Sequence, residues 1–363
     1  MKKIHLNLKE RSYDIIIGSG VFSLLPEVIK DLGLRGPVAV ITDNTVWKKA
    51  KKKIEPVLKH MSEGSFCICV PPSERSKSIE VFRDTAQKIA KRTKRHRPVV
   101  VAIGGGVVGD LAGFVAATYR RGVPLIQVPT TLLAQVDSSV GGKVGVDLPE
   151  AKNLVGAFYQ PKLVLMDTDF LKTLPHRQVS NGLAEVVKYG IIASKEFFAF
   201  IEKNAGKILS MDSNVIEKVI YECAGIKAAI VEKDELDVKD IRIDLNFGHT
   251  LGHAIEAAAD YSSKYNHGES VALGMLLACE IALRFDMLKE KDFMRVKKLL
   301  KKMGLPEKIQ KIGVEEVMKA YSYDKKFISG TSRLILPRRI GKVEVVEDIP
   351  ELPVRSALSE YVE

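Results

Sequence analysis

The sequence is poor in the residues that build disulfide-rich or zinc-ribbon proteins. Its 363 residues include only four cysteines, Cys67, Cys69, Cys223 and Cys279, and none of them forms a CxxC pair. This spacing excludes a zinc ribbon and offers no disulfide framework. We therefore expect all four to be small buried hydrophobic residues of a cytoplasmic protein.

Long apolar runs and aromatic residues are also scarce. No run approaches the roughly 18 apolar residues of a membrane span. The N-terminal segment MKKIHLNLKERSYDIIIGSG alternates polar with apolar residues and lacks the apolar centre of a signal peptide. Aromatic residues make up 7% of the chain, too few for the stacking surface of a nucleic-acid-binding protein. The sequence thus predicts neither a membrane nor a nucleic-acid partner.

The chain is basic, with a formal net charge of +11. Apart from the dense runs KKAKKK and KRTKRHR, which read as ends of amphipathic helices, its lysines and arginines are spread along the sequence. We interpret most of the excess as a solvated surface. That interpretation is compatible with a group of cations around a small anionic substrate.

Length and hydrophobic pattern predict two domains, because 363 residues exceed the size at which one core usually stops growing. Up to residue 170, short Val/Ile-rich runs alternate with helical segments, which indicates an α/β Rossmann-like domain with a mostly parallel sheet. Residues 171–363 have mainly helical patterns and end in a hairpin-like segment. The cleft between two such domains is the default site.

The runs that define these domains are short and bounded by Gly, Pro or Asp, as in buried strands. The expected strands are PVAVITD, SFCICV, RPVVVAIGGG, VPLIQVPTT and KLVLMD, with helices at TVWKKAKKKIEPVLKHM and SIEVFRDTAQKIAKRTKR between them. The expected C-terminal helices are RQVSNGLAEVVKYGIIAS, NVIEKVIYECAGIKAAIVEKD, HTLGHAIEAAAD and SVALGMLLACEIALRFDML, and the hairpin is SRLILPRRIGKVEVVED.

A glycine-rich turn follows one expected strand. Gly104, Gly106 and Gly109 have GxGxxG spacing where RPVVVAIGGG passes into a helix, and backbone amides at such a turn suit a pyrophosphate. The turn follows a late strand, and no acid lies about 20 residues further on to hold a ribose. Asp43, at the end of another strand, could take that role. We expect a dinucleotide site, with a turn needed only for packing as the alternative.

Three of the seven histidines, His249, His253 and His267, lie in NFGHTLGHAIEAAADYSSKYNHGES. The first two share a helix face because they are four residues apart. Thr250 stands where a zinc protease has glutamate, which disfavours a protease. Glu185, a charge in the otherwise apolar segment GLAEVVKYG, would complete a three-ligand metal site with an open position. Histidines that serve only as surface or core residues are the alternative.

The segment PTTLLAQVDSSVGGKVGVDLPEAKNLVGAFYQP shows little helical or strand periodicity. It carries polar groups among glycines, a composition suited to a loop around a phosphorylated, hydroxylated ligand. These groups are Asp137, Ser138, Ser139, Lys143, Lys152 and Asn153. A disordered loop is the alternative, although the interspersed apolar residues favour a packed one.

Together these motifs resemble the 3-dehydroquinate synthase family. The resemblance rests on GGGVVGDLAGFVAATYRRG, PTTLLAQVDSSVGGKVGVDLPEAKNLVGAF, TLPHRQVSNGLAEVVKYG, LNFGHTLGHAIE and YNHGESVALGM, in order and over essentially the whole chain. It implies an N-terminal NAD-binding domain, a helical metal domain and a homodimer. The implied reaction converts 3-deoxy-D-arabino-heptulosonate 7-phosphate to 3-dehydroquinate and phosphate, with NAD recycled and a divalent metal, zinc or cobalt, required.

The resemblance also assigns residues. Glu185, His249 and His267 match the metal ligands, and His253 matches a residue that faces the substrate. The positions that match the NAD site are Asp43, Pro72, Ser73, Glu74, Arg75, Ser76, Lys77, Gly106, Val107, Val108, Gly109, Asp110, Thr130, Thr131, Lys143, Lys152, Phe170, Leu171, Lys172 and Thr173. Those that match the substrate pocket are Asp137, Lys143, Lys152, Asn153, Lys188, Lys227, Arg242 and Asn246, with Arg121 matching an arginine from the partner subunit.

A few positions depart from the family pattern or align weakly. Ser73 replaces a glycine, Gln178 a glutamate and Asn181 a serine, and we expect these changes to affect NAD contacts. Either Lys325 or Lys326 is expected to supply another cation. Two rivals share the chemistry: 2-deoxy-scyllo-inosose synthase, whose substrate lacks the carboxylate that Arg242 would bind, and a metal-dependent polyol dehydrogenase, which would produce net NADH.

Overall fold

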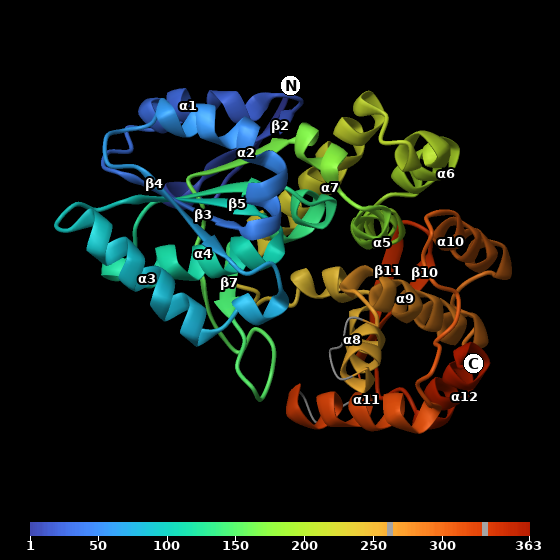
Figure 1. The fold of residues 1–363 in the computed structure, drawn as a ribbon. Helices are drawn as coiled ribbons and strands as arrows, with labels where there is room; N and C mark the ends of the chain where they lie inside the picture. Colours follow the sequence, from blue (N-terminus) through green and yellow to red (C-terminus); the bar gives the residue numbers. More distant parts are fainter. Residues whose placement is uncertain (260–263, 329–332) are drawn as a thin grey trace. The chain divides into compact units, whose positions relative to one another are not determined.

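The computed structural model describes residues 1–259, 264–328 and 333–363, without the side chains of 323–328. The chain forms two compact units (Figure 1). Unit 1 contains Met1–Leu174 and Ile216–Leu236, and unit 2 contains Pro175–Val215 and Asp237–Glu363. The sequence predicts a single boundary at residue 170, whereas here the chain returns to unit 1 for a further helix.

Unit 1 is built on a seven-stranded sheet in the order β1-β2-β9-β6-β5-β3-β4. Its strands are β1 (Lys2–Leu6), β2 (Tyr13–Gly18), β3 (Val38–Asp43), β4 (Phe66–Val70), β5 (Val99–Gly104), β6 (Leu125–Pro129) and β9 (Leu163–Asp167). All neighbours pair in parallel except β1 with β2. The five strands expected from the sequence are β3, β4, β5, β6 and β9, so the α/β prediction is confirmed.

Helices cover both faces of this sheet, which explains why its strands are continuous hydrophobic runs. The helices of unit 1 are α1 (Leu25–Asp31), α2 (Asn44–Lys59), α3 (Ile79–Thr93), α4 (Gly106–Thr118) and α7 (Ser213–Lys233). Along β5, Val100 and Ala102 pack with residues of α3 and α4, whereas Val101 and Ile103 pack with residues of α1 and α2. Successive side chains of a strand point to opposite faces, so each face has its own core.

Helix α7 joins unit 1 through contacts between residues distant in the sequence. The backbone amide of Asn7 donates to Glu232 at 2.7 Å. The Arg11 guanidinium pairs with Glu235 at 2.7 Å. These interactions attach the C-terminal half of α7 to the first residues of the chain, a pairing that helical periodicity does not reveal.

The segment that we expect to be a loop around the ligand has more structure than its composition suggests. It contains a π-helical turn, Ala134–Ser138, and an antiparallel hairpin of β7 (Lys143–Val146) and β8 (Val155–Phe158). Close approach of the two strands requires glycine, because a Cβ on Gly156 would lie 2.4 Å from the Val144 carbonyl oxygen. The segment is therefore packed, as its apolar residues indicate.

Unit 2 is mainly helical, as the sequence predicts. Its elements are α5 (His176–Ala193), α6 (Lys195–Leu209), α8 (His249–Ala258), α9 (His267–Arg284), α10 (Glu290–Lys302), α11 (Val314–Ile328), β10 (Arg333–Arg339), β11 (Lys342–Glu347) and α12 (Glu351–Tyr361). Strands β10 and β11 form the expected hairpin. None of the helices in the described ranges is both long and apolar enough to cross a membrane.

Helices α8 and α9 approach each other so closely that their contact depends on glycines. A Cβ on Gly274 would lie 2.0 Å from the Gly248 carbonyl oxygen and 2.7 Å from the Gly252 amide nitrogen. Both neighbours are backbone atoms, which cannot turn away as a flexible side chain can. The spacing of the two helices is therefore set by the absence of a side chain at Gly274.

We expect Gly274→Ala to destabilise unit 2 by about 1–3 kcal/mol, because the added methyl group forces the two helices apart. Gly206→Ala is the matched control: Gly206 is exposed within α6 and a Cβ there would meet no atom within 4 Å. The control should stabilise the protein by about 0.5–1 kcal/mol, since alanine is the better helix former. Denaturant unfolding of both variants measures the difference, and equal shifts would contradict the packing argument.

Candidate metal centre and its surroundings

Glu185 is a fully buried carboxylate on α5, a helix whose residues from Val179 to Ile192 are all buried. One turn along the helix, Lys188 is 1% exposed and its ammonium group pairs with Glu185. Lys188 also donates to the carbonyl oxygen of Leu245 at 2.8 Å. A charge without water needs such partners, because an isolated buried carboxylate is very costly.

His249 is the first residue of α8 and reaches Glu185 with its Nε2 atom, 3.4 Å from Oε1. Its Nδ1 lies 3.2 Å from the carbonyl oxygen of Phe247. A carbonyl oxygen only accepts hydrogen bonds, so Nδ1 donates and Nε2 keeps its lone pair for a ligand. The preceding Gly248 has φ 78°, a left-handed conformation that favours glycine at the turn into α8.

His267 is the first residue of α9, and its two ring nitrogens face two carboxylates. Nε2 lies 3.4 Å from Oε1 of Glu185, and Nδ1 lies 3.3 Å from Oε1 of Glu256 on α8. Asn266 caps α9 in a capping box with Glu269, which fixes where the helix begins. The start of α9 thereby determines the position of the His267 ring.

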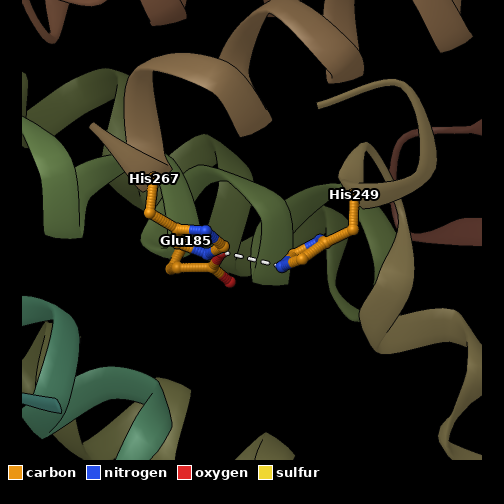
Figure 2. Close-up of side chains that lie close together, drawn as sticks. All are labelled: Glu185, His249 and His267. Atoms are coloured by element: carbon orange, nitrogen blue, oxygen red, sulfur yellow. Dashed lines mark ion pairs between the residues drawn. The ribbon is translucent and has the colours of Figure 1, made fainter. Parts of the chain in front are cut away.

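Glu185, His249 and His267 come from three helices and converge on one point (Figure 2). One donor atom from each lies within 4.8 Å of the others. The Nε2 atoms of His249 and His267 each lie 3.4 Å from Oε1 of Glu185. Donors about 2.1 Å from a tetrahedral zinc ion are about 3.4 Å apart, and one carboxylate with two imidazoles is a donor set that suits such an ion. The residues therefore fit a three-ligand site with an open position.

The charged surroundings shift the pKa values of the two histidines in opposite directions. Burial, with the nearby Lys188 ammonium, lowers the pKa of His249 to about 3. Burial alone would also lower the pKa of His267, but hydrogen bonds with Glu185 and Glu256 raise it to about 10. Glu256 thus adds to the effect of Glu185 on His267.

Glu256 is the residue of this centre that our sequence reasoning did not single out. It is 7% exposed and lies seven residues after His249, two turns along the same helix face. A carboxylate that accepts from the second nitrogen of a metal-binding histidine fixes the ring orientation and tautomer. The sequence signal for it was a glutamate seven residues after His249, on the same helix face.

His253 lies next to the three converging residues but outside their donor set. Its ring centroid is 5.5 Å from that of His249 and 6.3 Å from that of His267, and the side chain is exposed. The two histidines of the HxxxH pair are thus in different environments. Spacing alone leaves this open, because both lie on one helix face.

Asn181 stands where the family pattern has serine, and from the sequence we expect this change to affect NAD contacts. The structure instead places Asn181 in unit 2, where its Oδ1 accepts the backbone amide of Gly268 at 2.6 Å. This bond satisfies one of the free amides at the start of α9, next to His267. Gln178 lies one turn earlier and is exposed.

The remaining unit 2 candidates lie on the turn before α8. Arg242, 4% exposed, and Asn246, exposed, begin and end the 3-10 turn Arg242–Asn246. The carbonyl oxygen of Leu245, in the same turn, accepts from Lys188. The side chains of Lys325 and Lys326 are outside the described ones.

In unit 1 the glycine turn leads directly into the N-terminus of α4. Gly106 is the first residue of α4, and a Cβ on Gly105 would lie 3.1 Å from the Thr131 side chain. Asp43 at the end of β3 caps α2, accepting from the amides of Thr45 and Val46 through Oδ1 alone. Among the residues that the structure describes, none donates a hydrogen bond to its Oδ2.

The other predicted cofactor residues have unequal access to a ligand. Phe170 and Leu171 are 3% and 2% exposed, and the Phe170 ring packs on Phe22 at 5.4 Å between centroids, so these two can offer only backbone groups. Val108 and Ser76 are likewise buried, at 1% each. The exposed or partly exposed positions are Pro72, Ser73, Glu74, Arg75, Gly106, Val107, Gly109, Asp110, Thr131, Lys172 and Thr173, and Thr130 is buried.

The buried Lys77 contacts both the first turn of α4 and the residues between β7 and β8. Lys77 pairs with Asp110 in the first turn of α4 at 2.7 Å and donates to the side chain of Asn153. Burial alone would lower the pKa of Lys77, but Asp110 raises it, so the side chain remains an ammonium group. Elsewhere in unit 1, Lys227 donates to Asp137 at 2.8 Å. Lys143 and Arg121 are exposed, and Lys152 is half-buried.

Two family models and full-length relatives agree on the family that the chain resembles. Residues 67–181 match the family model for 3-dehydroquinate synthase N-terminal, and residues 182–327 match that for 3-dehydroquinate synthase C-terminal. The 3-dehydroquinate synthase of Desulforamulus reducens is 41% identical over 99% of this chain and 100% of that protein. That of Alkaliphilus metalliredigens is 43% identical over 97% of each.

Among solved structures, a 2-epi-5-epi-valiolone synthase from Streptomyces hygroscopicus subsp. jinggangensis 5008 with NAD+ and Zn2+ bound has a TM-score of 0.88 and 26% identity over 98% of each chain. A 2-deoxy-scyllo-inosose synthase complexed with carbaglucose-6-phosphate, NAD+ and Co2+ also has a TM-score of 0.88, with 26% identity over 99% of this chain and 100% of that one. A probable glycerol dehydrogenase from Sinorhizobium meliloti 1021, at 14% identity over 96% of this chain and 95% of that one and a TM-score of 0.66, shares the fold alone.

Loss of a residue that only hydrogen-bonds a metal ligand lowers metal affinity about 10–100-fold. We expect His249→Ala to weaken zinc binding by more than this, because it removes a ligand atom itself. His253→Ala, on the same helix face, is the matched control and should retain zinc. Titration of the metal-free proteins against a chromophoric zinc chelator gives both affinities. Retained stoichiometric zinc in His249→Ala and in Glu185→Gln would contradict the donor set.

Proposed function

The chain belongs to the 3-dehydroquinate synthase family, and from that premise we propose how its residues convert 3-deoxy-D-arabino-heptulosonate 7-phosphate to 3-dehydroquinate and phosphate. The observation that carries the proposal is the convergence of Glu185, His249 and His267 in unit 2. A lyase of this family needs a divalent cation beside a hydroxylated substrate, and this donor set can hold one.

Glu185, His249 and His267 are the proposed ligands of a zinc or cobalt ion. Bound there, the ion would polarise substrate oxygens as a Lewis acid and so acidify a hydroxyl group. The two carboxylates around His267 hold its ring, and Lys188 offsets the charge of Glu185. Gly248 fixes the start of α8 and the Asn266 cap fixes the start of α9, so both histidines are held in place before a metal binds.

NAD is the second proposed cofactor, and when bound it would accept a hydride and return it within one turnover. The positions proposed to hold it are those assigned by the family resemblance: Asp43, the segment from Pro72 to Lys77, the segment from Gly106 to Asp110, Thr130, Thr131, Lys143, Lys152 and the segment from Phe170 to Thr173. The glycine turn and the start of α4 support a pyrophosphate there. The burial of Phe170 and Leu171 restricts them to backbone contacts.

The proposed substrate site supplies cations for a carboxylate and a phosphate. Arg242 suits the planar carboxylate, because a guanidinium group can donate two parallel hydrogen bonds. The other proposed side chains are Asp137, Lys143, Lys152, Asn153, Lys188, Lys227, Asn246 and His253. Their role is to bind and orient the sugar acid and to keep water from its intermediates.

We further propose a cytoplasmic homodimer in which Arg121 reaches the substrate of the partner subunit. All four cysteines are free thiols, which agrees with a reducing compartment. Arg121 is exposed, and both it and Arg120 have positive φ, 62° and 49°. Arg120 donates to the carbonyl oxygens of Lys94 and Arg95 in its own chain, so Arg121 is the arginine of this turn that would suit a contact between copies.

Two related reactions are distinguishable by substrate and by cofactor balance. A 2-deoxy-scyllo-inosose synthase acts on a sugar phosphate without a carboxylate, so Arg242 would have no partner. A polyol dehydrogenase would accumulate NADH. The 41–43% identity to 3-dehydroquinate synthases over nearly the whole chain favours the proposed reaction over both.

The proposed reaction predicts that the zinc-loaded enzyme releases many equivalents of phosphate from the heptulosonate phosphate per NAD present, without net absorbance of NADH at 340 nm. Phosphate is measured with a coupled colorimetric assay and the carbocyclic product by mass spectrometry. Glucose 6-phosphate should release none. Phosphate release from glucose 6-phosphate alone, or stoichiometric NADH, would each assign the chain to one of the rivals.

A second prediction concerns Lys152. Replacing it with alanine should lower kcat/KM for the heptulosonate phosphate by about 10–100-fold, the cost of losing one hydrogen bond to a charged group. Zinc content should not change, because Lys152 belongs to unit 1 and the donor set to unit 2. Lys162→Ala is the control and should match the wild type, since Lys162 is an exposed lysine directly before β9. Unchanged kinetics in Lys152→Ala would remove it from the substrate site.

A further inference from the structure

Two loops of unit 1 meet at Asp147, a residue that none of the assignments above includes. The cofactor loop, residues 71–78, links β4 to α3 and carries Glu74 and Lys77. The substrate loop, residues 147–154, links β7 to β8 and carries Lys152 and Asn153. Asp147 is the first residue of the substrate loop, and it contacts both.

The backbone of Asp147 is attached to the cofactor loop. Its amide donates to the carbonyl oxygen of Lys77 at 2.7 Å, and Ser78 and Asp147 form a parallel β-bridge. These contacts use main-chain atoms, so any residue at position 147 could make them. They bring the side chain at 147 between the two loops.

The side chain of Asp147 is attached to the substrate loop. Its Oδ1 accepts the backbone amide of Asn153 at 2.7 Å. Asn153 has φ 57°, a left-handed conformation that non-glycine residues adopt at a cost. The loop closes on itself through the Leu148 amide and the Ala151 carbonyl oxygen at 3.1 Å. The hydrogen bond from Asn153 therefore fixes the backbone at the end of the substrate loop.

A single ammonium group completes the connection. Lys77 Nζ donates to the Asn153 side chain, lies 2.7 Å from Asp110 Oδ2, and lies 3.9 Å from Asp147 Oδ1. Lys77 is 5% exposed, so these interactions are only weakly screened by water. The Asp147 carboxylate thus fixes the backbone of Asn153 while its charge faces the lysine that fixes the Asn153 side chain.

We propose that Asp147 is a positioning residue that clamps the cofactor loop to the substrate loop, so that Lys77 and Asn153 reach their binding positions together. The inference rests on the proposed function for the roles of the two loops. It adds that NAD binding and sugar phosphate binding depend on one carboxylate that touches neither ligand.

A purely structural role for Asp147 predicts a different outcome. Loss of a turn-stabilising carboxylate would lower the temperature of unfolding and the fraction of active enzyme, but the folded fraction would keep its KM values. Loss of the clamp changes both KM values. The split between KM and kcat therefore separates the two roles.

The test compares Asp147→Ala, Asp147→Asn and the control Asp84→Ala in the zinc-loaded full-length enzyme. Asp84 is 56% exposed on α3 and pairs only with its neighbour Arg83 among the interactions described, so its variant should behave as the wild type. We expect Asp147→Ala to raise KM for the heptulosonate phosphate and KM for NAD about tenfold each. Asp147→Asn keeps an acceptor for the Asn153 amide and should show a smaller rise in both.

Hydrogen exchange of the peptide that covers residues 148–158 provides a readout that does not need turnover. The Asn153 amide should exchange faster in Asp147→Ala than in the wild type or Asp84→Ala. If the wild type does not turn over the sugar phosphate, the proposed function fails, and this exchange measurement alone then decides the clamp. Unchanged exchange, or unchanged KM values with only a lower unfolding temperature, would overturn the inference.

Discussion

The burial of one carboxylate constrains most of unit 2. Glu185 lies on a helix that is buried along most of its length, where an uncompensated charge is very costly. Lys188 and the protonated imidazole of His267 provide the compensation. His267 and His249, which is neutral, are each the first residue of a helix. The positive ends of the α8 and α9 helix dipoles therefore lie near the same anion. The buried charge of Glu185 thus lies at the point where α8 and α9 begin and where the metal donors meet.

That arrangement depends on small residues and caps more than on the histidines themselves. Gly248 permits the left-handed turn into α8, and Gly274 lets α9 approach the backbone of α8. Asn266 and Asn181 satisfy consecutive amides at the start of α9. Each of these groups fixes the direction in which a histidine ring points. The precision of the donor set comes from the helix ends, because a side chain on a fixed helix start has few ways to move.

In unit 1, loops that follow different strands are held together by shared side chains. In a parallel sheet the carboxyl ends of the strands share an edge, where ligands of this fold class bind. Asp43 follows β3, the cofactor loop follows β4 and the glycine turn follows β5. Lys77 and Asp147 then join the cofactor loop to the hairpin of β7 and β8. A buried ammonium and a carboxylate thus connect these loops. In unit 2, Lys188 and Glu185 likewise connect α5 to Leu245 and to the first residues of α8 and α9.

The sequence by itself determined part of the fold and the chemical type of the site. Apolar runs predicted β3, β4, β5, β6 and β9 but not β1 or β2, and residue types indicated an acid with histidines. Local periodicity and composition carry that information. Residue spacing left open which histidine of the HxxxH pair lies beside Glu185, that α7 returns to unit 1, that Glu256 lies beside His267, and that Asp147 contacts two loops. Those facts depend on contacts such as Asn7 with Glu232 and His267 with Glu185. Only the tertiary structure decided them, because residues far apart in the chain meet there through packing that no local pattern encodes.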